Sequence, residues 1–179
     1  MRRQPRLRRV LFAALAIGVL AFAGVTARLF VWPDLTPLPP EVDAIVELGG
    51  PGIRDGAALA LARAHRAPVL IQSTVASEAG TRRCLPPVPG VTIRCFHPDP
   101  DTTRGEARYI GEMARQQHWR SVAIVTTPDH AWRARLRVAR CFPGEIYVAT
   151  SPLPRRYWLV QIPYQWAATV KALLFERDC

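Results

Sequence analysis

The chain of 179 residues contains only four cysteines, and no two of them have the CxxC spacing. Four cysteines are too few for a disulfide-dense mini-protein, and the missing CxxC spacing excludes a zinc ribbon. The sequence also lacks a GxSxG elbow, an HExxH helix and a P-loop, so it indicates none of the reactions that these motifs serve. Charged residues make up only 21% and hydrophobic residues 49%, which excludes a disordered chain. The length fits one ordinary domain with a short appendage.

Acidic residues are scarce, with 14 Asp and Glu against 24 Lys and Arg, of which only Lys171 is a lysine. Much of the positive excess lies next to one apolar run. Six arginines flank that run: Arg2, Arg3, Arg6, Arg8, Arg9 and Arg28. Without them, 18 basic residues face all 14 acidic ones. So modest an excess argues against the dense basic face of a nucleic-acid-binding protein.

The apolar run covers residues 10–27 and contains no charge. As a helix it would be about 27 Å long, close to the ~30 Å hydrocarbon core of a bilayer. Residues 1–9 form a basic arm that should stay cytoplasmic by the positive-inside rule. We therefore expect residues 10–28 to be a transmembrane signal anchor and the rest of the chain to be extracytoplasmic. A cleaved secretory signal has the same topology and ends on similar small residues, and the protein would then be secreted.

The cysteines agree with export, because an oxidising compartment favours pairing an even number of them. Four cysteines allow three connectivities, which sequence alone cannot distinguish. We expect the local pair Cys84–Cys95, which leaves Cys141 to pair with Cys179. The alternative is four buried thiols in a reduced protein.

The exported part divides into a spacer and a domain. Residues 29–41 include the proline-rich stretch PDLTPLPP, which predicts a stiff stalk that lifts the domain off the membrane. Residues 42–179 form the domain. Short apolar runs predict strands at 44–48, 68–72, 91–96, 121–125 and 145–149, and helical patterns lie at 53–64, 104–117, 131–141 and 164–175. This alternation predicts an α/β fold with a mainly parallel sheet covered on both faces.

Ligands of open α/β sheets bind beyond the carboxyl ends of strands, so the residues that follow each strand are candidates. Gly49 and Gly50 follow the first strand and would let the backbone approach a ligand closely. Arg54 lies at the start of the next helix, where an arginine fits best if a phosphate or carboxylate lies between it and the free amides. A tight structural turn is the alternative role for the glycines.

The fourth strand is followed by Thr127, Pro128, His130 and Arg133. Thr127 can cap a helix whose first position is Pro128. His130 then lies in the first turn over the end of the strand, and Arg133 follows on the same face. His130 could act as an acid or base or bind an anion. Alternatively, it bonds its own helix end.

Further candidates follow the second and third strands. Thr103 and Glu106 have capping-box spacing, which is a sufficient structural explanation for both. The functional hypothesis places Thr103, Arg104 and Glu106 in one crevice. Ser73 is a candidate nucleophile, although its neighbours Gln72 and Thr74 supply no base.

Other patterns favour structural roles. Arg137 and Arg140 continue the helical spacing of Arg133, and we expect them to form a solvated stripe. His97, Asp99 and Asp101 could be read as an oxygen and nitrogen metal site, but the prolines between them indicate a rigid loop, and we predict no metal there.

Three segments together resemble the YdcF/SanA/ElyC-like family. Residues 43–50 (DAIVELGG) are similar to its opening D-A-I-V-V-L-G-G, residues 103–107 (TRGEA) to its T-x-E-N/E-A block, and residues 125–134 (VTTPDHAWRA) to its V-T-S-x-x-H-x-x-R-A block. The resemblance covers residues 42–174. It implies a Rossmann-like three-layer α/β/α domain held at the bacterial plasma membrane by one helix. Members are linked to envelope biogenesis, including the lipid-carrier and peptidoglycan-precursor pathways.

Together, the residues and the resemblance predict an envelope protein that binds, and hydrolyses or transfers, a phosphorylated small molecule or lipid-linked precursor. The ligand-binding candidates are Gly49, Gly50, Arg54, Ser73, Thr103, Arg104, Thr127 and Arg133. The catalytic candidates are His130, as general acid or base, and Glu106, which would orient it. One alternative is a non-catalytic scaffold or sensor that retains an anion pocket. Another is a nucleotide-cofactor transferase, for which Glu78 would be the ribose-binding acid. The sequence leaves open whether the protein is an enzyme, and it indicates no cofactor.

Overall fold

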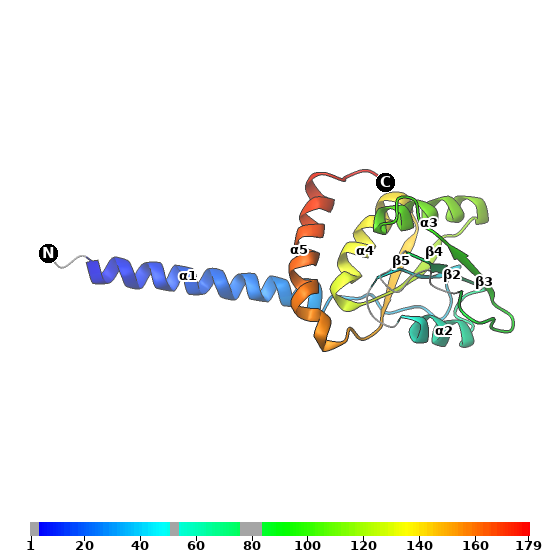
Figure 1. The fold of residues 1–179 in the computed structure, drawn as a ribbon, viewed down its shortest axis with the longest axis horizontal. Coiled ribbons are helices and arrows are strands. Elements are labelled where there is room, and N and C mark those ends of the chain that lie inside the picture. The colour runs from blue at the N-terminus through cyan, green and yellow to red at the C-terminus, as the bar shows by residue number, and fades with distance from the viewer. Residues whose placement is uncertain (1–3, 51–53, 76–83) are drawn as a thin grey trace.

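The computed structural model describes residues 4–50, 54–75 and 84–179 of the chain, with the backbone alone for 4–7. One sheet has the strand order β3-β2-β1-β4-β5 (Figure 1). Its strands are β1 (Ala44–Glu47), β2 (Val69–Ser73), β3 (Thr92–Phe96), β4 (Ser121–Thr126) and β5 (Glu145–Thr150). Every neighbouring pair is parallel, with Val46 of β1 opposite Ile71 of β2 and Ile124 of β4. The predicted mainly parallel sheet is thus parallel throughout.

Helices cover both faces of the sheet and make the three layers of a Rossmann-like fold. The helices of the domain are α2 (Asp55–Arg63), α3 (Thr103–Gln117), α4 (Pro128–Cys141) and α5 (Trp158–Leu174), and a short 3-10 turn, η2 (Arg155–Tyr157), precedes α5. Val46 and Ile124 pack with α3 and α4 on one face, whereas Ile45 and Val125 pack with α2 on the other. Because both faces are covered, all four residues of β1 are buried. This explains the continuous apolar runs in the sequence.

The strand order reverses between β1 and β4. After β1 the chain builds β2 and β3 on one side, and it then returns to build β4 and β5 on the other. The loops that leave the carboxyl ends of β1 and β4 therefore diverge, and they open a crevice between them. This topology brings Gly49, Gly50 and Arg54 close to residues 126–133.

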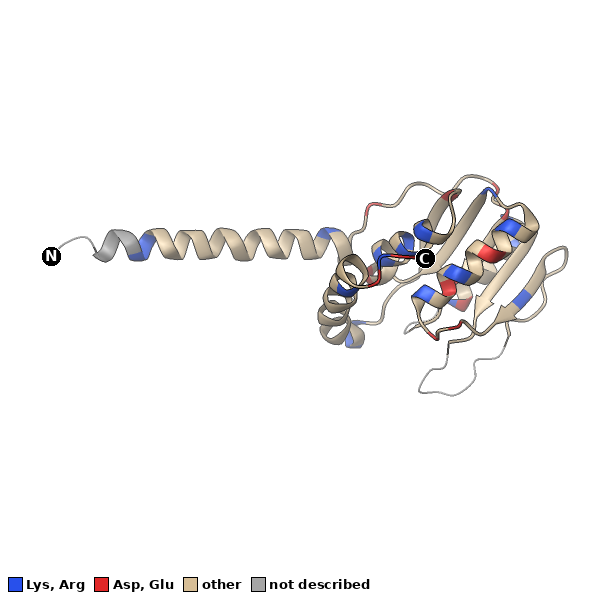
Figure 2. Cartoon of the chain, turned by 90° about the horizontal axis from the view of Figure 1, so that it is seen from above, with Lys and Arg blue, Asp and Glu red and all other residues tan. Residues whose placement is uncertain are grey.

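The apolar run forms α1 (Gln4–Thr26), which continues as a single π-helical turn, η1 (Ala27–Val31). Residues 8–31 are long and apolar enough to cross a membrane. Figure 2 shows the helix as a long tan rod with basic residues at both ends. Phe30 of η1 is completely buried. The apolar helix therefore leads directly into the domain.

The proline-rich segment is extended, but it does not hold the domain away from the apolar helix. Arg66 donates hydrogen bonds to the carbonyl oxygens of Leu38 and Pro39, at 3.2 and 2.6 Å. Leu38 also packs against the core on the α2 side. The segment therefore lies along the domain, and the prediction that it lifts the domain off the membrane stays a prediction.

Both expected disulfides are present. Cys84 pairs with Cys95, with 5.8 Å between their Cα atoms, and Cys141 pairs with Cys179, with 4.9 Å between theirs. The alternative of four free thiols is excluded. The second disulfide ties the C-terminal tail, residues 175–179, to the end of α4.

Two helices begin three or more residues earlier than the sequence predicts. Helix α4 begins at Pro128 rather than Ala131, since proline suits the first helical position. Helix α5 begins at Trp158 rather than Tyr164 and contains Pro163. A proline inside a helix removes one backbone hydrogen bond, because it has no N–H group to donate.

Candidate functional site

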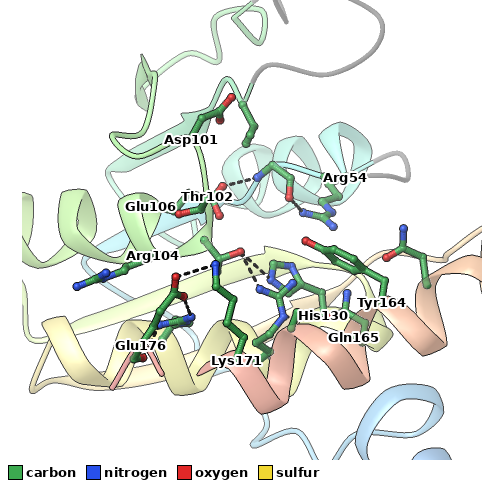
Figure 3. Close-up of a pocket in the computed structure, with 18 residues that line it drawn as sticks. Arg54, Asp101, Thr102, Arg104, Glu106, His130, Tyr164, Gln165, Lys171 and Glu176 are labelled. Atoms are coloured by element: carbon green, nitrogen blue, oxygen red, sulfur yellow. Dashed lines mark hydrogen bonds and ion pairs between the residues drawn. The ribbon is translucent and has the colours of Figure 1, made fainter. Parts of the chain in front are cut away.

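A cavity of about 220 Å³ lies in the crevice beyond β1 and β4 (Figure 3). Its floor comes from the loop after β1 and the first turns of α3 and α4, and its far wall comes from α5 and the C-terminal tail. The lining residues include five cationic side chains (Arg54, Arg104, Arg133, Arg137 and Lys171) and three acidic ones (Asp101, Glu106 and Glu176). The volume is below the ~300 Å³ at which pockets for drug-sized ligands begin. The cavity therefore suits a small anionic group.

The two glycines after β1 are required by packing and by backbone conformation. A Cβ on Gly49 would lie 1.6 Å from Cγ2 of Val75, and Gly50 has a φ of +126°. The N–H of Gly49 donates a 2.6 Å hydrogen bond to Oε1 of Glu106. This amide is therefore bonded within the protein, as the structural-turn alternative expects, although both glycines line the cavity.

Glu106 is almost fully buried at the base of the cavity. Burial raises the pKa of its carboxyl group, while the Ser73 hydroxyl, the Gly49 N–H and the positive charge of Arg54 act in the opposite direction. A carboxyl group with a raised pKa can donate and accept protons nearer to neutral pH than an ordinary glutamate. Ser73 is completely buried at the end of β2 and does not line the cavity.

Arg54 lines the cavity, but its guanidinium group bonds to the protein itself. It donates to the carbonyl oxygens of Leu48 (2.7 Å) and Gly49, and at 3.2 Å to the hydroxyl of Thr127. The side chain is 1% exposed. Arg54 thus joins the end of β1 to the start of α4 and contributes positive charge beneath the cavity.

Hydroxyl groups connect His130 and Arg133. Nδ1 of His130 lies 2.9 Å from the hydroxyl of Thr126, and Nε2 lies 3.2 Å from the hydroxyl of Thr103. Arg133 donates to the same Thr103 oxygen at 3.2 Å. A neutral ring that carries its proton on Nδ1 fits this series of hydrogen bonds, since it donates to Thr126 and accepts from Thr103.

The surroundings of His130 favour that neutral ring. Burial holds the pKa of His130 well below its usual 6.5, and the charges of Arg133 and Arg54 lower it further. A neutral imidazole is the form that can act as a general base. In this tautomer the unprotonated nitrogen is Nε2, which faces the hydroxyl of Thr103.

Arg133 is held in place by α5. Its Nε donates a 2.9 Å hydrogen bond to Oε1 of Gln165, and the amide nitrogen of Gln165 donates at 2.9 Å to Asp129. The guanidinium carbon lies 5.7 Å from the centre of the Tyr164 ring. Burial lowers the pKa of Arg133, so its charge carries a desolvation cost that a bound anion would offset.

Arg137 also lines the cavity, so the expected solvated stripe is wrong for this residue. Its side chain is only 5% exposed and forms an ion pair with Glu176 of the C-terminal tail. Lys171 pairs with the same carboxylate at 2.8 Å. This pairing was not predicted from the sequence, because it depends on the tail folding back over α4.

The helix cap of α3 is one residue earlier than the capping box predicts. Thr102 is the N-cap, and its hydroxyl accepts from the N–H of Gly105 at 3.4 Å. The shift turns Thr103 toward His130 and directs Glu106 inward to Gly49. Arg104 lines the cavity and is paired with Asp178 of the tail.

The other candidates have structural positions. Thr127 is the N-cap of α4 by backbone position, but its side chain makes no capping hydrogen bond and instead accepts from Arg54. The ring of His97 bonds the carbonyl oxygen of Thr74. In the part of the chain that the structure describes, no three His, Cys, Asp or Glu residues lie together to hold a metal ion. Glu78 lies outside the described residues.

The contribution of α5 to the pocket was not predicted from the sequence. Five of its residues line the cavity: Gln161, Tyr164, Gln165, Ala168 and Lys171. A signal was present, since Gln161, Gln165 and Thr169 recur every four residues in a largely apolar helix and so share one face. That pattern indicates a polar contact inside the domain.

Fold and site together define a Rossmann-like α/β domain, preceded by an apolar helix that could span a membrane, with a cationic pocket at the switch point of its sheet. Comparison of the chain with models of known protein families, with curated proteins and with solved structures found no match.

Proposed function

We propose that this protein is a membrane-anchored, extracytoplasmic protein of bacterial envelope biogenesis that binds a phosphorylated metabolite and hydrolyses or transfers its phosphoryl group. The metabolite class would be that of the lipid-carrier or peptidoglycan-precursor pathway. The family resemblance of residues 43–50, 103–107 and 125–134 supports this class.

The observation that carries the proposal is the position of Arg133. Arg133 is 7% exposed, and its guanidinium group lies between Thr103 and Gln165 at the wall of a small cavity with a cationic excess. A planar guanidinium with several donors suits the oxygen atoms of a phosphate. Arg137 and Lys171 would contact the same anion if it displaced Glu176.

The acid–base groups lie beside this anion site. Neutral His130 would accept the proton of the Thr103 hydroxyl, or of a water molecule in its place, while that oxygen forms a bond to phosphorus and the bond between phosphorus and the leaving oxygen breaks. Glu106, with its raised pKa, would supply a proton to the leaving oxygen. The cationic side chains would stabilise the charge that develops on the phosphoryl oxygens.

An uncleaved anchor agrees best with the contacts of α1. Trp166 of α5 stacks on Phe22 at 5.2 Å and donates a 3.1 Å hydrogen bond to Thr26. Cleavage after Ala27 would remove both partners. The two disulfides agree with an oxidising, extracytoplasmic location for the domain.

The test uses the full-length protein in lipid nanodiscs and measures thermal shifts with inorganic phosphate, pyrophosphate and undecaprenyl phosphate. A ligand at ~100 times its dissociation constant should add about 2.7 kcal/mol of stability. Arg133→Gln should abolish the shift. Arg135→Gln, an exposed site on the same helix, should leave it intact. No shift with any phosphorylated compound would contradict the proposal.

One observation favours the alternative of a non-catalytic scaffold or sensor. Both ring nitrogens of His130 are bonded to threonine hydroxyls, so the ring reaches a ligand only through Thr103. An assay for the release of phosphate from a lipid-linked pyrophosphate distinguishes an enzyme from a non-catalytic scaffold or sensor. Loss of turnover in Thr103→Val, with phosphate affinity retained and turnover restored in Thr103→Ser, indicates catalysis. Binding without turnover in the unaltered protein indicates the scaffold.

A further inference from the structure

The outward face of α5 is apolar. Gln165, Thr169 and Ala172 are buried against the domain. The exposed residues on the opposite side of the helix are Leu159, Val160, Pro163, Ala167, Val170 and Leu174. Leu159 is 89% exposed and Val160 67%. A helix on the surface of a water-soluble domain has its polar residues on this side, so α5 has the reverse pattern.

Helix α1 fixes the position of α5 relative to a membrane. Trp166 of α5 stacks on Phe22 and meets Phe30 edge-on, with ring centres 5.2 and 5.3 Å apart. From Arg9 to Phe22 a helix rises about 20 Å. The hydrocarbon core is about 30 Å thick. If Arg9 marks the cytoplasmic edge of that core, Phe22 is still inside it, and its stacking partner lies at the depth of the outer leaflet.

The direction of α5 agrees with this depth. Figure 1 shows α5 running across the axis of α1, on the side of the domain from which α1 departs, and in Figure 2 the same helix is seen nearly end-on beside α1. If α1 crosses the bilayer, α5 lies along the membrane plane. Its buried face is turned to the domain, so its apolar face is turned toward the lipid.

The ends of α5 have charges suited to such a position. Two exposed arginines, Arg155 and Arg156, lie in the turn η2 directly before it. Between Trp158 and Val170 the sequence has no charged residue. Long basic side chains beside an apolar helix face reach lipid phosphates while the face itself contacts acyl chains.

We propose that α5 is an interfacial helix whose outward face, defined by Leu159, Val160, Pro163, Ala167, Val170 and Leu174, is immersed in the outer leaflet of the bilayer. The domain then has two attachments to the membrane, α1 across it and α5 along its surface. The inference does not depend on what the pocket binds. It also explains why the outward face lacks polar residues, which a domain held away from the membrane would need.

The test is the depth of a nitroxide spin label on the full-length protein, whose four native cysteines are paired. Ala167→Cys places the label on the outward face of α5. Ala60→Cys, an exposed alanine on α2 at the opposite face of the sheet, is the matched control. Both proteins are reconstituted into vesicles of phosphatidylcholine and phosphatidylglycerol at about 3:1, since an anionic surface attracts basic side chains. Collision rates with oxygen, which concentrates in lipid, and with a water-soluble nickel chelate report the depth.

We expect the Ala167→Cys label to collide with oxygen several-fold more often than with the nickel chelate, and the Ala60→Cys label to show the reverse. Equal access of nickel to both labels would overturn the proposal, because the face would then be in water. A label at 167 that is immobilised and shielded from both reagents would also overturn it, since a second protein chain would then cover the face. Preserved disulfides and an unchanged far-ultraviolet spectrum would establish that both variants are folded.

Discussion

His130 has three features that affect its protonation: burial, two hydroxyl partners and two nearby guanidinium groups. All of them favour the neutral ring, so the folded protein binds a proton at this site less readily than the unfolded chain does. The ring therefore makes the stability of the fold depend on pH.

We expect the contribution of His130 to stability to be complete above its unfolded pKa of about 6.5. It should be lost as the pH falls below that value, with a slope of at most about 1.4 kcal/mol per pH unit. Glu106, with its raised pKa, contributes in the opposite sense, so the unaltered protein alone cannot isolate the effect. Denaturant unfolding between about pH 5 and 8, the range in which a histidine titrates, should show His130→Asn destabilised most at the upper end. The difference should shrink toward the lower end, and a constant difference would contradict the neutral ring.

Gly105 gives a second prediction at this scale. A Cβ at this position would lie 2.0 Å from the carbonyl oxygen of Pro100, which is backbone and cannot move aside easily. Gly105→Ala should destabilise the protein by about 3 kcal/mol. Gly56→Ala on α2, where nothing lies within 4 Å, should instead stabilise it by up to about 1 kcal/mol. Denaturant unfolding measures both changes, and similar effects of the two substitutions would contradict the contact.

Which residues reach the pocket could be predicted in part from the sequence. Gly49, Arg54, His130 and Arg133 follow strands, and strand ends converge at a known edge of a parallel sheet. The partners of these residues could not be predicted. A shift of the α3 cap by one residue decides whether Thr103 caps the helix or bonds His130, and the local pattern fits both.

At the scale of elements, the C-terminal tail closes one side of the pocket. Cys179 is bonded to Cys141, and Glu176 of the tail pairs with Arg137 and Lys171. The sequence could suggest the disulfide from cysteine number and export. The ion pairs could not be predicted, because the tail carries no pattern that indicates its direction.

Removing the Cys141–Cys179 disulfide should lower the free energy of unfolding more than removing the local Cys84–Cys95 disulfide. The Cys141–Cys179 loop spans 38 residues and the Cys84–Cys95 loop 11. The chain-entropy model gives about 4 and about 3 kcal/mol for loops of these lengths. Replacing each pair by serines and measuring unfolding by denaturant should give losses in this order. The opposite order would mean that packing around the local disulfide in the folded protein outweighs the difference in chain entropy.

The carboxylate of Glu176 in the C-terminal tail should also compete with a bound anion for Arg137 and Lys171. The hydrogen bond from Lys171 lowers the pKa of Glu176, and the charge of Arg137 adds to this, so the carboxylate is ionised at neutral pH. Glu176→Gln should tighten the binding of inorganic phosphate several-fold in titration calorimetry. Glu112→Gln, an exposed site on α3, is the control and should leave affinity unchanged. Weaker binding in Glu176→Gln would show that the tail supports the ligand instead.

At the scale of the whole molecule, the layered architecture was predictable because strands and helices alternate along the chain. The close approach of the domain to α1 was not. It depends on Trp166 meeting Phe22 and Phe30, which are far from it in the sequence, and no local pattern links them.

The topology gives the prediction at this scale. If the domain is extracytoplasmic, as we propose, a C-terminal alkaline phosphatase fusion should be active and a C-terminal green fluorescent protein fusion dark. The two disulfides agree with this location, and so do the arginines that precede the apolar run, by the positive-inside rule. The mature protein should keep its full-length mass. A product that begins near residue 28 would support the secreted form.

Lys171 is the single lysine of the chain, and it lies in the wall of the pocket with 63% of its side chain exposed. Acylating reagents that modify amines therefore have one side-chain target in this sequence. The extent of acylation at this one position, read by mass spectrometry, would count occupied pockets directly. Ligands of unknown structure could then be ranked from mixtures by how well they protect one amine.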